Sequence, residues 1–160
     1  MSIFSYKYFL LIGFLIGIAP NWSYSQNFNE RKVEKRLKKK FLKISKEGRP
    51  FEVSRLQNVK SANLTEWTID SSQTIVAIYQ YDSIEDAKVA LKKQLMKVSV
   101  GVPEISLNLG DENYLFKSKV SNRGMLLIRK GLLLIQMNTN DVNTSIDLAK
   151  ILLKEVQNDK

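Results

Sequence analysis

The stretch EISLNLGDENYLFKSKVSNRGMLLIRKGLLLIQM, residues 104–137, decides the fold class. In it, short apolar segments are separated by glycine, asparagine, aspartate and serine, which favour tight turns. The pattern predicts strands over residues 105–109, 114–120, 125–129 and 132–137. Lys130 and Gly131 form a predicted two-residue hairpin loop, because glycine readily adopts a positive φ. We therefore expect an antiparallel meander.

The flanking segments extend this prediction to a whole domain. Residues 74–81, TIVAIYQY, have the β-branched and aromatic residues typical of a strand. Weaker strand patterns precede it, at residues 51–56 and 64–69. Amphipathic patterns predict helices over residues 84–98 and 144–156. This order indicates an α+β fold with an antiparallel sheet of about five to six strands.

Apolar residues on both faces of the strands mean that both faces need to be covered. Residues 126–128 and 132–135 are continuously apolar, whereas a sheet with one solvated face would alternate. We expect the helices at 84–98 and 144–156 to pack together on one face. The other face would be met by a basic N-terminal helix, by the early strands, or by a second copy of the protein in a homodimer.

The net charge of +9 is concentrated in one short segment. Between Glu30 and Arg49 there are ten lysines and arginines against three glutamates, whereas residues 50–160 are nearly neutral. Residues 29–46 lack glycine and proline, and their apolar positions lie on one side of a helical projection. The sequence predicts three parts: a signal peptide at 1–25, for which the evidence is given below, a basic amphipathic helix at 26–50 and a single α+β domain at 51–160.

The basic helix is the strongest candidate for a binding site. Its candidate residues for anionic surfaces are Arg31, Lys32, Lys35, Arg36, Lys38, Lys39, Lys40 and Lys43. They would bind anionic lipid headgroups or acidic envelope polymers; a protein partner and a merely solvated face are the alternatives. Nucleic acid is not expected, because Phe41 is the only aromatic residue within the run.

Residues 1–25 have the layout of a secretory signal peptide. Lys7 precedes a 12-residue apolar run at 8–19, and small residues at Ser23 and Ser25 predict cleavage before Gln26. A membrane anchor is the alternative, but spanning a bilayer takes about 20 apolar residues. The protein is therefore expected to be exported to the periplasm or the extracellular space and soluble after cleavage. Without cysteine it cannot be a cysteine-linked lipoprotein.

The chain contains neither histidine nor cysteine, which removes the usual zinc, copper and iron ligands and the usual general bases and thiol nucleophiles. A glycine turn gathers oxygen ligands that could suit calcium: Asn108, Asp111, Glu112 and Asn113. Such residues also favour turns, so we assign no metal, cofactor or catalytic residue. The composition favours a non-catalytic exported binding module; a small carboxylate-dependent, hydrolase-like enzyme is the alternative.

Three features of the sequence together carry a resemblance to known domains: the turn LGDENY at 109–114, the RKG hairpin at 129–131, and the terminal helix containing Leu148 and Ala149. The pattern resembles small exported bacterial α+β domains of uncharacterised function, over residues 74–156. The resemblance implies an α+β fold and a location outside the cytoplasm. It implies no activity and supplies no catalytic residues.

Overall fold

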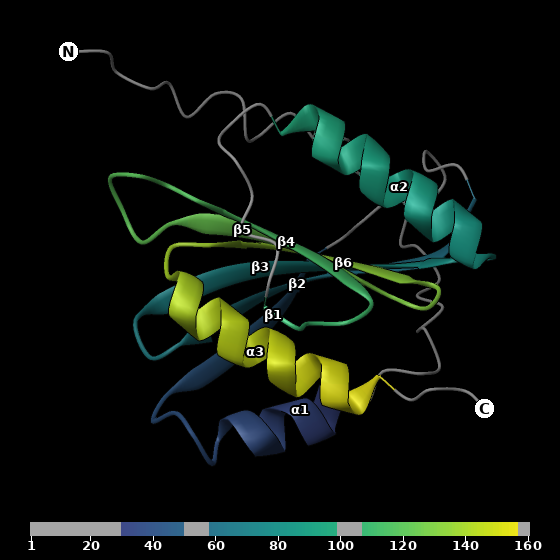
Figure 1. Ribbon diagram of the computed structural model, residues 1–160. Coiled ribbons are helices and arrows are strands. Elements are labelled where there is room, and N and C mark those ends of the chain that lie inside the picture. Colours follow the sequence, from purple (N-terminus) through teal and green to yellow (C-terminus); the bar gives the residue numbers. More distant parts are fainter. Residues whose placement is uncertain (1–29, 50–57, 99–106, 157–160) are drawn as a thin grey trace, which may run out of the picture.

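Six strands form one antiparallel sheet in the computed structural model, which describes residues 30–49, 58–98 and 107–156 (Figure 1). The strands are β1 (Ile44–Arg49), β2 (Val59–Ile69), β3 (Ser72–Tyr81), β4 (Glu112–Lys117), β5 (Gly124–Lys130) and β6 (Leu133–Thr139). The helices are α1 (Glu30–Leu37), α2 (Ile84–Lys97) and α3 (Val142–Glu155). The predicted α+β class and the antiparallel sheet are confirmed.

Two three-stranded meanders make up the sheet, in the order β1-β2-β3-β6-β5-β4. β3 and β6 pair antiparallel in the middle, and α2 carries the chain from central β3 to β4 at the far edge. The predicted meander is confirmed for β4, β5 and β6. Its first predicted strand, at 105–109, lies partly outside the described residues, and residues 107–109 are not in a strand. The strand predicted at 51–56 lies outside the described residues.

The hairpin between β5 and β6 turns one residue later than predicted. Lys130 pairs with Leu133, so Gly131 and Leu132 form the loop. Gly131 has a φ of +56°. Tight hairpin turns of the favoured types need a positive φ at the first loop position, which is why glycine takes that position and Lys130 remains in the strand.

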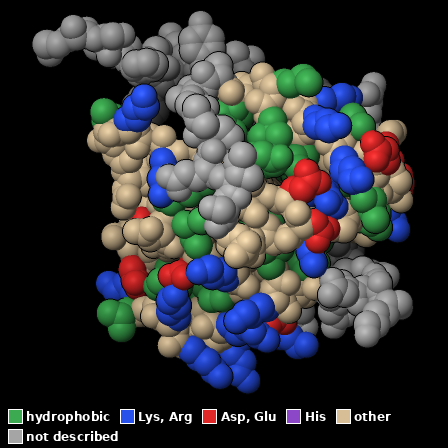
Figure 2. All heavy atoms as spheres, viewed as in Figure 1, with side chains coloured by type: hydrophobic (Ala, Val, Ile, Leu, Met, Phe, Trp, Pro, Cys, Tyr) green, Lys and Arg blue, Asp and Glu red, His purple; other side chains and the backbone are tan. Residues whose placement is uncertain are grey.

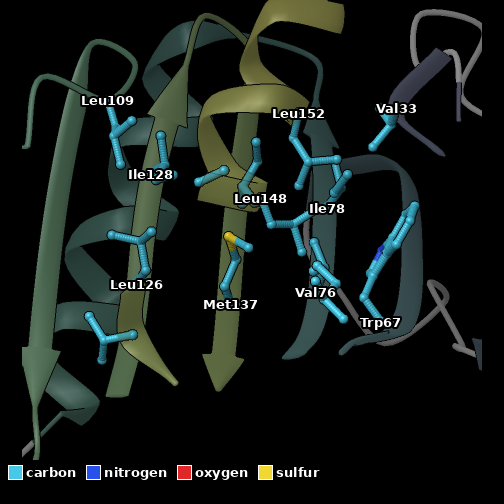
Figure 3. Packing of buried hydrophobic residues seen from close by; sticks show 14 of the residues in the cluster. Val33, Trp67, Val76, Ile78, Leu109, Leu126, Ile128, Met137, Leu148 and Leu152 are labelled. Carbon is cyan, nitrogen blue, oxygen red and sulfur yellow. The ribbon is translucent and has the colours of Figure 1, made fainter. Parts of the chain in front are cut away.

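Helices cover both faces of the sheet, as expected, but α2 and α3 lie on opposite faces, whereas the sequence-based expectation placed both on one face. α2 buries Ala87 and Leu91 against Leu127 and Leu134 on one face. On the other face, α3 lies beside α1 and buries a different set of apolar residues (Figures 1 and 3): Leu148, Ala149 and Leu152 against Leu126, Ile128 and Met137. The apolar positions of an amphipathic helix show how wide its buried surface is, but not which face of the sheet it meets. The sequence therefore could not assign α2 and α3 to separate faces.

The basic helix is shorter than predicted. α1 ends at Leu37 instead of Lys46, and residues 44–49 form the edge strand β1, paired in register with β2. Val33 and Leu37 are fully buried, whereas Phe41 and Ile44 are half-buried. Pairing with the otherwise open edge of β2 satisfies backbone groups along β1, and this outweighs the moderate helix propensity of its sequence. The segment is therefore part of the sheet and not a separate helix.

Candidate functional site

Exposed cations gather around α1 and the turn that follows it. Figure 2 shows lysine and arginine side chains along the lower margin, where Figure 1 places α1. Within the described part of the chain, five of the predicted candidates are exposed and have no ion pair: Arg31, Lys35, Lys38, Lys39 and Lys43. We call these five residues the basic edge.

The remaining three predicted candidates have other interactions. Arg36 Nε lies 2.5 Å from Glu155 Oε1, and Lys40 Nζ lies 2.6 Å from Asp147 Oδ2, so both cations pair with α3. Lys32 is exposed on α1 and has an interaction partner. The structure thus brings the eight candidates to one side of the molecule but leaves five of them for an external partner.

The pairs to α3 fasten α1 to the body of the protein. Glu155 is only 6% exposed, and its Oε1 accepts no aligned hydrogen bond, so the nearby Arg36 guanidinium balances it by charge. A buried carboxylate without a countercharge would be costly. Together with the buried side chains of Val33 and Leu37, this pairing makes α1 a docked helix that presents its cations on a rigid support.

The turn between α1 and β1 is held by the turn between β2 and β3. Asp70 Oδ1 accepts hydrogen bonds from the backbone N–H groups of Leu42 (3.0 Å) and Lys43 (2.9 Å). The N–H of Asp70 donates in return to the Lys43 carbonyl at 2.7 Å. Sequence reasoning did not single out Leu42, which is 97% exposed beside Lys43. The available signal was a leucine outside the apolar side of the predicted helix, placed two residues after the run Lys38–Lys40 and directly before Lys43.

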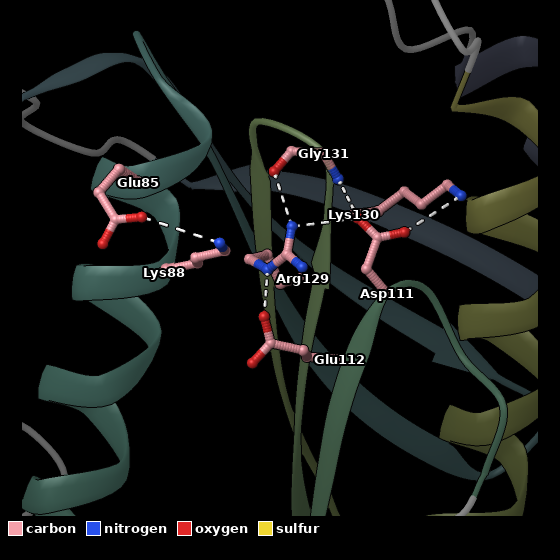
Figure 4. A network of polar contacts seen from close by, with 7 residues as sticks. All are labelled: Glu85, Lys88, Asp111, Glu112, Arg129, Lys130 and Gly131. Atoms are coloured by element: carbon pink, nitrogen blue, oxygen red, sulfur yellow. Dashed lines mark hydrogen bonds and ion pairs between the residues drawn. The ribbon is translucent and has the colours of Figure 1, made fainter.

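The oxygen-rich turn at 108–113 has a structural explanation that needs no metal (Figure 4). Arg129 is 6% exposed, and its guanidinium donates to Glu112 Oε1 at 2.6 Å and to Asp111 Oδ2 at 3.1 Å. Asp111 also accepts the N–H of Gly131 at 2.7 Å and lies 3.4 Å from Lys130 Nζ. These carboxylates neutralise a buried cation, which makes them poor candidates for the acid and base of a hydrolase.

The other two members of the proposed calcium group do not join this network. The Asn113 Oδ1 accepts the N–H of Leu107 at 3.2 Å, and Asn108 is an exposed residue with a φ of +50°. In the described ranges, no group of three or more acidic residues could hold a metal ion. The turn chemistry that the sequence suggested as the alternative therefore accounts for these residues.

Gly110 allows the turn to approach the neighbouring strand. It has a φ of +69°, and a Cβ at this position would lie 2.5 Å from the Arg129 carbonyl oxygen. That oxygen accepts the N–H of Asp111 at 2.8 Å. The LGDENY turn and the RKG hairpin, which carried the resemblance noted above, thus meet in one network that joins the start of β4 to the β5–β6 hairpin.

This network predicts a loss of stability in acid. Partial burial would raise the pKa of Asp111, but the Gly131 N–H and the charges of Lys130 and Arg129 outweigh it and lower the pKa. A carboxyl with a lowered folded-state pKa stabilises fully above its unfolded value of about 3.9, and this contribution is lost as the pH falls through the folded pKa. Urea denaturation of Asp111→Asn should give lower stability at neutral pH and a flatter decline below about pH 4. An equally steep decline in both proteins would contradict this role.

Within the described residues, no helix is long and apolar enough to cross a bilayer; the predicted signal peptide lies outside them. Models of known protein families give no match to this chain, and curated proteins show no significant similarity to it.

Proposed function

We propose that the protein is an exported, non-catalytic binding module that attaches to an anionic envelope component through the basic edge. The observation that carries this proposal is five exposed cations without ion pairs on a docked helix and its following turn. The signal-peptide layout of residues 1–25 supports export. Positive charge on a rigid surface favours a partner with a dense array of negative charges.

The charge of the basic edge is large enough to contribute to binding of an anionic surface at physiological salt. A lysine or arginine close to an anionic membrane surface contributes about 1 kcal/mol of binding free energy. The screening length falls from about 10 Å at 0.1 M salt to about 3 Å at 1 M. Binding by the basic edge should therefore weaken steeply as salt is added.

Removing three charges from the basic edge should weaken binding to anionic surfaces. The triple variant Lys38→Gln, Lys39→Gln and Lys43→Gln should bind mixed phosphatidylglycerol–phosphatidylcholine vesicles and dextran sulfate roughly a hundredfold more weakly, at about 1 kcal/mol per charge. Vesicle co-sedimentation and titration with dextran sulfate measure the two affinities. Glutamine changes helix propensity little.

A matched control comes from α2, on the opposite face of the sheet. Lys92, Lys93 and Lys97 are also exposed, so their replacement by glutamine removes the same net charge from another surface. This control should retain most of the binding. Equal binding by the basic-edge variant and the parent would show that the basic edge is only a solvated face.

A further inference from the structure

Leu42 is an apolar side chain placed within the basic edge. It is 97% exposed, more than any other exposed large hydrophobic residue in the described chain. Lys43 follows it directly, and Lys38 and Lys39 lie in the same turn. Single exposed hydrophobic residues are common and need no explanation by themselves. Val120 and Met96 are also exposed beside a lysine, but Leu42 lies within the basic edge, and its backbone is held by Asp70 of another turn.

The fixed backbone keeps Leu42 from packing onto the core. Two N–H groups of the turn donate to Asp70 Oδ1, and the Asp70 N–H bonds back to Lys43. Phe41 and Ile44, on either side of Leu42 in the chain, pack against the core cluster, whereas Leu42 does not. Lys40 Nζ lies 5.6 Å from the centre of the Phe41 ring, which leaves that ring partly covered by a cation. Leu42 is therefore held outward in a defined position.

We propose that the turn at residues 38–43 docks on an anionic lipid bilayer, with Leu42 entering the boundary between headgroups and acyl chains and the neighbouring lysines contacting the headgroups. This inference rests on the proposed function and names the partner within it. A soluble polyanion offers charge alone and would leave Leu42 in water. A bilayer offers an apolar layer directly beneath its charged surface, which matches a leucine surrounded by lysines.

The energetics fit two weak contributions acting together. Moving a leucine side chain from water into the bilayer strengthens binding roughly ten- to a hundredfold. Lysines near anionic lipid add a separate, salt-dependent attraction. Stable peripheral attachment usually needs two such signals. Because α1 is docked, this mode of binding requires no new helix, and circular dichroism should show no gain of helicity with vesicles.

Replacing Leu42 tests the proposal directly. Leu42→Ser should weaken binding to vesicles of phosphatidylglycerol and phosphatidylcholine in equal parts at least tenfold, by the loss of the buried side chain. Its binding to dextran sulfate should be unchanged, because every cation is retained. Met96→Ser is the matched control, since Met96 is 84% exposed on α2, which packs on the face of the sheet opposite to α1. It should behave like the parent with both probes.

A second variant reports insertion itself. Leu42→Trp should retain vesicle binding and shift its fluorescence emission to the blue with vesicles but not with dextran sulfate. Equal vesicle binding by Leu42→Ser and the parent, or an unshifted emission of Leu42→Trp on bound vesicles, would overturn the proposal. If the parent binds dextran sulfate but not vesicles, the lipid inference fails and the proposed function stands. If it binds neither, both fail.

Discussion

Leu91→Ala and Leu152→Ala are each expected to lower the free energy of unfolding by about 2–5 kcal/mol, measured by urea denaturation. Each leucine is 1% exposed, so alanine leaves a cavity as well as removing apolar contacts. Met96→Ala is the control, because Met96 is 84% exposed on α2 and should change stability by less than about 0.5 kcal/mol. Losses below about 1 kcal/mol for both leucines would contradict their burial.

The double variant of these leucines tests the two-sided architecture. Leu91 belongs to the cluster under α2, and Leu152 belongs to the cluster under α1 and α3, on the other side of the sheet. Residues without shared contacts have additive effects within about 0.5 kcal/mol. We therefore expect the double variant to lose the sum of the two single losses. A coupling well above that limit would indicate that the two helices share one core.

Leu37→Ala should also lower the free energy of unfolding by about 2–5 kcal/mol, because Leu37 is completely buried at the end of α1. The result matters for function, since a docked α1 presents a rigid charged surface whereas a detached amphipathic helix would insert its apolar stripe into lipid. Urea denaturation gives the stability. Circular dichroism with and without anionic vesicles should show constant helicity for the parent.

Leu42→Ala is the control for this prediction within the same segment. Leu42 makes its turn contacts through the backbone and exposes its side chain, so alanine should leave stability within about 0.5 kcal/mol of the parent. Unchanged stability of Leu37→Ala, or a gain of helicity when the parent meets vesicles, would mean that α1 is detached in solution.

The candidate site could be predicted only in part. The sequence shows which segment holds the excess of cations, because a charge imbalance needs no tertiary information. Which of them are free depends on α3: Glu155 and Asp147, more than 100 residues away in the chain, neutralise Arg36 and Lys40. The role of Asp111 and Glu112 was likewise hidden, because their partner Arg129 reaches them only through the pairing of β4 with β5.

The sequence by itself determined the α+β class, the strands β3, β5 and β6, the helix α2 and the need to cover both sheet faces. These features depend on local propensity, turn chemistry and the spacing of apolar residues, all of which are set by residues close together in the chain. Only the tertiary structure decided that α2 and α3 lie on opposite faces, that the basic helix ends at Leu37, and that residues 44–49 join the sheet. Each of those outcomes is set by contacts between segments that are separated in the chain. Pairing with an open strand edge, or packing on a particular face of the sheet, outweighs the weaker local preference of the residues for helix or strand.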